Sequence, residues 1–513
     1  MASAYITQAL WSATTEPRSY APLTGDLDVD VAIIGAGITG LSAAYLLAKS
    51  GQRVAVLEEK QVGMGTTGSS TGNLYAPVDE HLYSVESKHG QDTLKAVAAS
   101  RTAAIHLVEQ LVREHGIDCD FERVPWYFFS EPGDDLMHSV EKEFKAVEAT
   151  GLSVSKEVPV DFPFQVDALV NLAYQAQFNP LKYVQGLAAA VAEEYCQIFE
   201  NTKVTRVEDG EPCVVHTSYG TVRARKVIMA THSPKGIYGV HTAMEPYREY
   251  ALAVKLKGEL PAGGVYWHMQ QMQHYSVRPY RSEEGSYLLL LGEAHKVGTK
   301  EHNEEAFPKL EQYLRQRFEV DSVVFKWAAQ NYKPADVLPY IGTSPMEKNT
   351  YIATGFAADG LTYGTLAGMI LHDLILGKEN EWAKMYSPTR FTPAASAPKF
   401  VKENISVATH LVKDYLLFGE ADELKEIKAG EGKTIKLEDE RLAAYRDEEG
   451  QLHVVSAVCT HMGCILHFNN AEKSWDCPCH GSRFSVDGEV LEGPAYDALA
   501  KKNITYDNPN PTE

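Results

Sequence analysis

Cysteine is scarce in this sequence, with seven residues among 513. Seven are too few for a disulfide scaffold in a chain of this size. Four of them fall between Cys459 and Cys479, which indicates a local metal site. Cys119, Cys196 and Cys213 stand apart, and we interpret them as buried thiols without chemistry.

Long apolar runs and an excess of positive charge are also missing. No segment approaches the roughly 18 to 20 uncharged apolar residues that cross a bilayer, and residues 1–20 lack the pattern of a signal peptide. The formal net charge of −21 repels phosphate backbones and anionic lipid surfaces. We therefore expect a cytoplasmic protein with no transmembrane segment and no nucleic-acid partner.

What the sequence does contain is ample core material for several structural units. The hydrophobic fraction is 44% and the charged fraction 23%, typical of a globular protein. A length of 513 residues exceeds the roughly 250 to 300 at which one core stops growing. The chain shows no fixed-period repeat, so two or three different units are expected.

Residues 29–58 predict a strand, a glycine turn, a helix and a second strand. The turn, GAGITG, has the spacing that lets a backbone approach a pyrophosphate at a helix N-terminus. Glu58 ends the second strand, where an acidic side chain accepts hydrogen bonds from a ribose. Such a site serves NAD as well as FAD, so this motif alone does not choose between them.

Over residues 28–380 the sequence resembles the D-amino-acid oxidase and glycine oxidase superfamily of flavoproteins. The likeness includes the glycine turn, the loop GMGTTGSSTGNL, the segments KVTRVE and VIMATHS, and DVLPYIG followed by ATGFAADGLTYG. The resemblance implies an FAD site and a helix N-terminus at the pyrimidine edge of the flavin, where the macrodipole favours the anionic reduced form. Some relatives attach FAD through cysteine or histidine, and neither occurs in GTTGSSTGNL or in ATGFAADGLTYG, so we predict a non-covalent flavin.

The expected FAD-binding residues are spread over these motifs. They are Gly35, Gly37, Ile38, Thr39, Gly40, Glu58, Gly65, Thr66, Ser69, Ser70, Gly72, Val204, Ala230, Thr231, Gly355, Gly360, Leu361 and Thr362.

In the superfamily a second sheet covers the flavin, and its aromatic and arginine side chains hold an amine or amino acid. The resemblance makes Arg248, Tyr275, Arg278, Tyr280 and Tyr363 the candidate substrate residues. An arginine can bind a substrate carboxylate in bidentate fashion, although for each candidate a surface salt bridge or a structural role is the commoner interpretation. His295 and Tyr332 are weaker candidates, and hydride transfer to flavin requires no dedicated catalytic base.

The strongest motif is CTHMGC at 459–464 with CPCHGSRF at 477–484. Cys459 and Cys477 can bind one iron while His461 and His480 bind the other, the division that defines a Rieske 2Fe-2S centre. A Cys2His2 zinc site uses the same types of ligand and is the alternative.

The motif resembles the Rieske proteins of cytochrome complexes over roughly residues 420–510, which favours the cluster over zinc. That resemblance implies a disulfide between Cys464 and Cys479 and a hydrogen bond from Ser482 to a bridging sulfide. Phe484 departs from the family, because high-potential members carry a tyrosine there. With one donor to sulfur missing, we expect a potential inside the roughly −150 to +300 mV Rieske range rather than at its top.

Together these features predict an α/β, Rossmann-like FAD-binding domain of the glutathione-reductase type, an inserted α+β substrate domain and a small all-β Rieske domain. Residues 83–150 predict mainly helix, 241–332 mainly strand, and the proline-rich 387–398 a linker ahead of an amphipathic helix. The expected divisions are as follows: an N-terminal extension at 1–27; an FAD-binding domain at 28–82, 155–240 and 333–386; a substrate domain at 83–154 and 241–332; a linker and helix at 387–419; and the Rieske domain at 420–513.

The expected function is a dehydrogenase that oxidises an amine or amino acid and passes electrons from FAD through the cluster to a one-electron carrier or a quinone. Three alternatives remain. An NAD(P)H-linked reductase needs a second nucleotide-binding βαβ unit, and the sequence pattern predicts no second unit of this kind. A Rieske oxygenase needs a mononuclear iron site in a different catalytic fold. A redox sensor or carrier without its own substrate is the third.

Overall fold

The computed structural model of the chain describes residues 6–192, 194–236, 239–270, 273–300, 302–390, 424–437 and 440–502. The chain divides into two compact units. The first comprises residues 1–234, 247–294 and 306–398, and the second comprises residues 235–246, 295–305 and 399–513. The predicted linker and amphipathic helix fall largely between 391 and 423, outside the described residues.

An eight-stranded sheet in the first unit carries the predicted glycine turn. Its main path runs β17-β18-β11-β2-β3-β8, and the neighbours from β18 to β8 are parallel. β2 and β3 are buried on both faces, as their continuous Val, Ile and Ala runs require of central parallel strands. The strands are β2 (Leu27–Ile34), β3 (Val54–Leu57), β8 (Cys196–Phe199), β9 (Val204–Glu208), β10 (Cys213–Thr217), β11 (Thr221–Met229), β17 (Tyr340–Thr343) and β18 (Thr350–Thr354).

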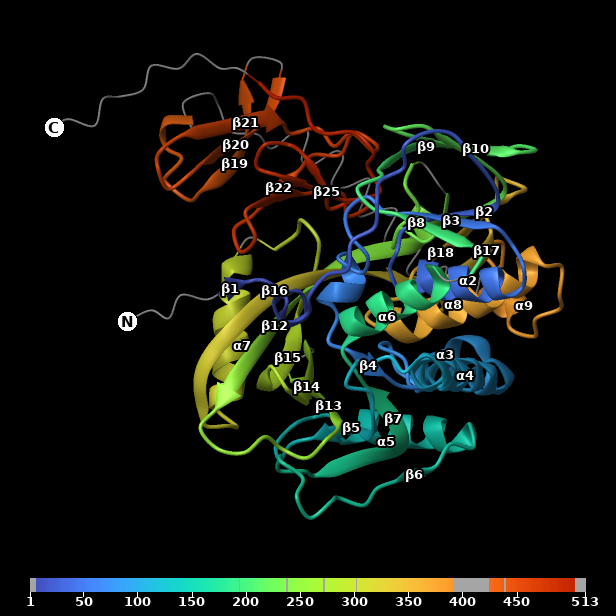
Figure 1. Cartoon of the computed structure of the whole chain (residues 1–513). Coiled ribbons are helices and arrows are strands. Elements are labelled where there is room, and N and C mark those ends of the chain that lie inside the picture. Colours follow the sequence, from blue (N-terminus) through green and yellow to red (C-terminus); the bar gives the residue numbers. More distant parts are fainter. Residues whose placement is uncertain are drawn as a thin grey trace. The chain divides into compact units, whose positions relative to one another are not determined.

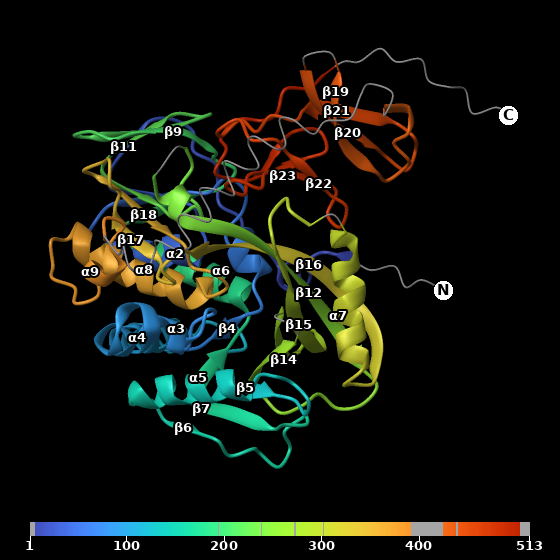
Figure 2. The same cartoon turned by 180° about the vertical axis from the view of Figure 1, so that it is seen from behind.

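Three helices pack together on one face of this sheet, as Figures 1 and 2 show: α2 (Ile38–Lys49), α6 (Pro180–Ala192) and α8 (Gly360–Ile375). Glycines allow α8 to approach α2 closely. A Cβ on Gly364 would lie 2.6 Å from Thr39 Oγ1, and a Cβ on Gly368 would lie 2.7 Å from Ser42 Cβ. The N-termini of α2 and α8 are thus held side by side.

The second sheet of the first unit has ten strands in the order β1-β16-β12-β15-β14-β13-β5-β7-β4, with β6 paired to β7. Its strands are β1 (Ile6–Thr7), β4 (Asn73–Leu74), β5 (Glu122–Ser130), β6 (Val154–Ser155), β7 (Ala168–Gln177), β12 (Met244–Leu256), β13 (Val265–Gln270), β14 (Gln273–Ser282), β15 (Gly285–Lys296) and β16 (Val320–Pro334).

Two features of this sheet were not expected from the sequence. Residues 83–150 are mainly helical, as predicted, but ERVPWYFFS among them forms β5, where aromatic residues fit a pleated, buried surface. β7 pairs with β5 in this sheet, although the sequence pattern assigns residues 155–240 to the nucleotide fold. The remaining helices of the unit are α1 (Leu10–Thr14), α3 (Leu82–His89), α4 (Gln91–His115), α5 (Met137–Ala149), α7 (Ala306–Arg315) and α9 (Ala383–Tyr386).

The described part of the second unit contains two small antiparallel sheets, which agrees with the predicted all-β domain. Cys459, Cys477 and Phe484 lie in one apolar core with Trp475. The sheets consist of β19 (Gly432–Leu437), β20 (Glu440–Arg446) and β21 (Leu452–Ser456), and of β22 (His467–Asn469), β23 (Ser474–Asp476), β24 (Arg483–Ser485) and β25 (Val490–Glu492).

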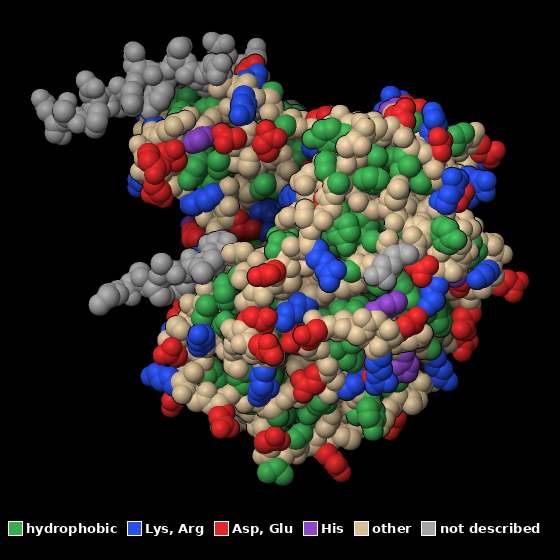
Figure 3. All heavy atoms as spheres, in the orientation of Figure 1, with side chains coloured by type: hydrophobic (Ala, Val, Ile, Leu, Met, Phe, Trp, Pro, Cys, Tyr) green, Lys and Arg blue, Asp and Glu red, His purple; other side chains and the backbone are tan. Residues whose placement is uncertain are grey.

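The described residues include no helix that is both long enough and apolar enough to span a membrane. On the face seen in Figure 3, Lys and Arg side chains are interspersed with Asp and Glu.

Candidate functional site

The turn between β2 and α2 brings backbone atoms too close together for side chains. Gly35 has a φ of +102°, and a Cβ there would lie 2.6 Å from the carbonyl oxygen of Ala230. A Cβ on Gly40 would lie only 2.0 Å from the Gly35 oxygen. The glycines therefore let the helix start directly against the strand and leave room for a phosphate group at its N-terminus.

The first turn of α2 is suited to an anion. Gly37 supplies no side-chain cap, and no acidic residue occupies the first turn. The Ile38 amide donates to Thr67 Oγ1 at 3.1 Å. Glu58, immediately after β3, accepts from the Ala36 amide at 2.8 Å and so lies beside the turn. This arrangement fits a dinucleotide with its phosphates at the positive helix end.

Three side chains from different elements hold the loop at residues 65–72. Trp11 of α1 donates to the Ser70 carbonyl at 2.6 Å, and Trp327 of β16 donates to the Ser69 carbonyl at 2.8 Å. Arg278 of β14 donates to the Gly72 carbonyl at 2.6 Å. The loop that resembles the flavin loop is thus fixed against the ten-stranded sheet.

The N-terminus of α8 is the second helix end at this site. Asp359 precedes it without a side-chain capping bond, and a Cβ on Gly360 would meet no atom within 4 Å. Leu361 and Thr362 are buried beside it. Of the other predicted residues, Ala230 bonds to Ile34 through its amide at 2.9 Å, which places the end of β11 beside the glycine turn.

Replacing Gly40 by alanine should weaken FAD binding roughly tenfold or more, because the methyl group meets a backbone oxygen that cannot move freely. Flavin content after gel filtration measures the effect. Gly25→Ala is the matched control, because a Cβ there meets nothing within 4 Å. Undiminished flavin in the Gly40 variant would show that the helix does not start against this turn.

The two faces of the ten-stranded sheet have different neighbours. On one face Tyr275 stacks on Tyr313 of α7 at 4.2 Å, and Tyr250 contacts Phe307. The other face carries Trp327 and Arg278, which bond to the 65–72 loop. We call this second surface the loop face. Because side chains alternate along a strand, residues two positions away from Trp327 or from Arg278 on the same strand also lie on the loop face.

The loop face carries buried charge that the sequence analysis missed. Lys333 of β16 contacts Asp79 at 2.7 Å and Glu80 at 3.3 Å. The Asp79 amide donates to Asp359 at 2.9 Å, which connects this group to the N-terminus of α8. Burial, and then the charge of Asp79, raises the pKa of Glu249 of β12 to about 7.

We call Asp79, Glu80, Glu249, Asp359, Lys333 and Arg101 the buried charge cluster. Arg101 contacts Asp359 at 3.4 Å, and burial raises the pKa of Asp359 to about 6. Burial raises the pKa of Glu249 and of Asp359, so a positive charge placed beside these two carboxyl groups is favoured. Charged residues inside otherwise apolar strands, such as Glu249 in EYALAVKL, are the signal for the cluster in the sequence.

Two histidines lie next to this cluster. His81 and His274 have ring centroids 5.1 Å apart, and burial lowers the pKa of both. Neither ring nitrogen of His81 has a hydrogen-bond partner among the described residues. His81 also packs against Phe128 and Trp267. A neutral, partly unsatisfied histidine in an aromatic surrounding is suited to contact a substrate.

The five substrate candidates from the sequence do not converge. Arg278 and Tyr280 share the loop face, where Tyr280 donates to Asp120 at 2.8 Å. Arg248, which donates to the Ala328 carbonyl, and Tyr275 share the opposite face. Tyr363 lies in the core under the Arg101 guanidinium, 4.3 Å from its ring centroid.

Arg278 stands out among them. It is 1% exposed, and burial lowers its pKa to about 10. Its Nε and Nη2 have no partner among the described residues. Of the weaker candidates, Tyr332 accepts from Gln330 at 2.8 Å, and His295 belongs to the second unit.

In the second unit, His461 and His480 lie together with ring centroids 5.0 Å apart. Among the described residues the Nδ1 atoms of both rings are buried without a hydrogen-bond partner. Burial lowers the pKa of both histidines, that of His480 to about 4. Two neutral imidazoles with unused buried nitrogens have the state that metal ligation requires.

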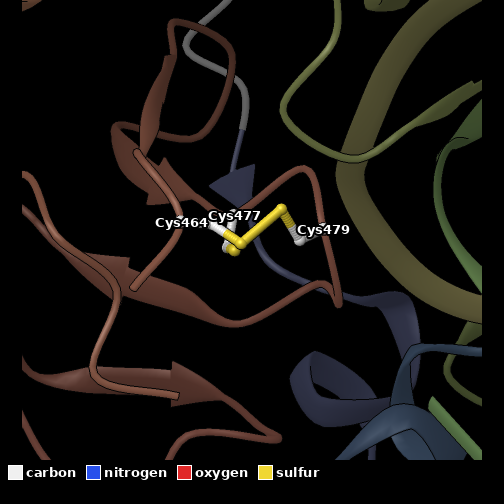
Figure 4. A group of neighbouring side chains, drawn as sticks. All are labelled: Cys464, Cys477 and Cys479. Carbon is white, nitrogen blue, oxygen red and sulfur yellow. A yellow bond between two sulfur atoms is a disulfide. The ribbon is translucent and has the colours of Figure 1, made fainter. Parts of the chain in front are cut away.

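The cysteines divide into a disulfide and a thiol pair. The sulfurs of Cys464, Cys477 and Cys479 lie within 4.8 Å of one another, but Cys464 and Cys479 form a disulfide, as Figure 4 shows. Cys477 therefore keeps its thiol, which donates a hydrogen bond to the sulfur of Cys459. That bond, with further bonds from the His461 amide and the Ser482 hydroxyl, lowers the pKa of Cys459. Cys459, Cys477, His461 and His480 thus fit two thiolate and two imidazole ligands.

Phe484 is fully buried in β24, opposite Trp475 of β23. Its ring offers no donor to a sulfur, whereas a tyrosine hydroxyl would. Phe484→Tyr should raise the midpoint potential of the cluster, because a hydrogen bond to sulfur favours the reduced state. Redox titration followed by EPR measures the shift, with Phe468→Tyr in the same unit as the control. An unchanged potential would mean that the hydroxyl reaches no sulfur.

This geometry defines the class: a flavoprotein that also holds an iron-sulfur cluster. Comparison with known proteins agrees. The family described as FAD dependent oxidoreductase matches residues 30–374, and the Rieske [2Fe-2S] domain matches residues 418–503. The chain belongs to the FAD dependent oxidoreductase family, and it binds FAD in its first part and a 2Fe-2S cluster in its Rieske domain.

Some similar proteins match nearly the whole chain, and others match one part of it. A putative Rieske 2Fe-2S iron-sulfur protein, YhfW of Bacillus subtilis (strain 168), is 34% identical over 97% of this chain and 98% of its own. Gamma-glutamylputrescine oxidoreductase of Escherichia coli (strain K12) is 25% identical over 70% of this chain and 87% of its own. The structure of glycine oxidase from Geobacillus kaustophilus covers 71% of this chain and 99% of its own, with a TM-score of 0.59 and 19% identity.

Proposed function

We propose that this protein is a dehydrogenase that oxidises an amine or amino acid at its C–N bond and delivers the electrons through the Rieske cluster to a one-electron carrier or a quinone. The observation that carries the proposal is the buried charge cluster on the loop face, beside the N-terminus of α8. Two of its carboxyl groups have a pKa raised by burial, which suits a substrate that brings a positive charge. The names of two relatives, which refer to gamma-glutamylputrescine and to glycine, agree with a nitrogen-containing substrate.

The flavin accepts two electrons as a hydride, whereas a 2Fe-2S cluster carries one electron at a time. The residues around the site bind and orient the substrate. In this proposal Glu249 and Asp79 hold the ammonium group of the substrate, and Lys333 holds Asp79 in place through their 2.7 Å ion pair. The unused N–H groups of Arg278 are available to a substrate carboxylate.

Two alternatives have less support. An NAD(P)H-linked reductase needs a second nucleotide-binding βαβ unit, but both described sheets of the second unit are antiparallel. A sensor or carrier without its own substrate does not need the buried charge cluster next to a flavin site.

The test is an anaerobic screen of amines and amino acids against the purified holoprotein, with flavin absorbance as the readout. A substrate should bleach the flavin, and the EPR signal of the reduced cluster should then appear. Bleaching by NADH or NADPH alone would favour the reductase, and no bleaching by any donor would favour the sensor. In air, peroxide should form much more slowly than substrate is consumed with a one-electron acceptor present. Peroxide that matches turnover, and persists without the cluster, would contradict the electron route.

A further inference from the structure

The histidine ligands of the cluster are in contact with a distant part of the sequence. Residues 235–246 belong to the second unit, although they follow β11 and lead into β12 along the chain. The Gly236 carbonyl accepts a hydrogen bond from Nε2 of His461 at 3.1 Å. The Gly236 amide donates to the Pro494 carbonyl at 3.1 Å, so Gly236 is hydrogen-bonded through both its carbonyl and its amide.

The Gly236 contact determines which nitrogen of His461 can bind iron. A carbonyl oxygen only accepts, so Nε2 must carry the proton. Nδ1 then holds the free lone pair, and among the described residues this is the atom that is buried without a partner. A carbonyl acceptor on the other ring nitrogen is how proteins commonly fix the orientation of a metal-binding histidine and raise its basicity.

His241 contacts both ligands. Its ring centroid lies 5.2 Å from that of His461, with the planes at 86°, and 6.1 Å from that of His480. The side chain is 4% exposed. His241 therefore packs against the two imidazoles whose positions fix the second iron.

The two cysteine ligands and the side chains beside them are buried. Cys459 and Cys477 are 2% and 1% exposed, and Ser482 and Phe484 are fully buried. His461 is the ligand with appreciable exposure. Gly236 and His241 thus contact the most exposed of the four ligands.

We propose that Gly236 and His241 are positioning residues for the cluster: Gly236 orients His461 through its carbonyl, and His241 holds both imidazoles in place and limits the entry of water. The proposal rests on the Rieske cluster and not on the identity of the substrate. Its test therefore reads the cluster directly, without turnover.

Gly236 has a φ of +100°, a conformation that alanine adopts only with strain. Gly236→Ala should displace the carbonyl, lower the basicity of His461 and raise the midpoint potential of the cluster, with a change in its EPR g-values. Gly239→Ala is the matched control, because it lies in the same segment and a Cβ there meets nothing within 4 Å. A potential that both variants leave unchanged, or that both change equally, would overturn the role of Gly236.

His241→Ala should accelerate the bleaching of the oxidised cluster by EDTA about tenfold, whereas His241→Phe should restore most of the resistance by refilling the space. His302→Ala, at a histidine whose side chain is 73% exposed, is the control. Flavin absorbance reports in each variant that the first unit is folded. Bleaching of His241→Ala at the wild-type rate would overturn its role. The role of His241 would also be overturned if His302→Ala bleached as fast as His241→Ala.

Discussion

Cys477→Ser should give a protein that keeps its flavin and still bleaches with substrate but no longer contains the 2Fe-2S cluster. Cys477 is 1% exposed, and its thiol hydrogen-bonds to the sulfur of Cys459. The two neighbouring cysteines, Cys464 and Cys479, form the disulfide. A serine hydroxyl is a poor ligand for iron compared with a thiolate. Reduction of a one-electron acceptor should fall roughly 100-fold or more, because the loss of a ligand exceeds the effect of losing a supporting contact.

Iron and acid-labile sulfide analysis, with EPR after dithionite reduction, measures this prediction. Cys213→Ser is the matched control, because Cys213 is an equally buried free cysteine in the first unit. Wild-type iron content in Cys477→Ser would remove Cys477 from the ligand set. Zinc in place of iron in the wild type would restore the alternative that the sequence left open.

The second large effect is expected at Glu249. Glu249→Gln keeps the shape of the side chain but removes its charge, so kcat/KM for an amine should fall about 30-fold, equivalent to about 2 kcal/mol. In the wild type, kcat/KM should rise with pH through the pKa of Glu249 at about 7, since only the ionised carboxylate attracts an ammonium group. The variant should lack this rise. A smaller dependence from Asp359, with a pKa of about 6, should remain.

A measurement of thermal stability distinguishes the loss of charge at Glu249 from unfolding of the variant. The pKa of Glu249 is raised from 4.5 to about 7 in the folded state. The unfolded chain therefore loses the proton first, and stability falls as pH rises between these values. Glu249→Gln should thus have a Tm at pH 8 equal to or above that of the wild type, measured by calorimetry. Glu259→Gln, at an exposed position beyond the same strand, is the control. Unchanged kcat/KM in Glu249→Gln would remove Glu249 from the substrate site.

Much of the fold could be predicted because the decisive contacts are local in sequence. The glycine turn, the helix after it and Glu58 lie within residues 29–58, and their spacing follows from the geometry of a single βαβ unit. The cluster motif is equally compact. The fold class and both cofactors are confirmed by the family matches.

The substrate site could not be predicted in the same way. Glu249 lies on β12, Lys333 on β16 and Asp79 in the loop before α3, so only the tertiary fold brings them together. The resemblance draws attention to arginines and tyrosines. However, the alternation of side chains along β12 and β14 places Arg248 and Tyr275 on the face that α7 covers. The substrate assignments remain predictions.

The unit that contains the Rieske motif is assembled from three separate stretches of sequence. A fragment that began after residue 398 would leave Gly236 and His241 behind, and it would expose His461 to exchange with buffer. We therefore expect that a fragment cut at the proline-rich region does not hold the cluster stably. A separately expressed cluster domain must include all three stretches.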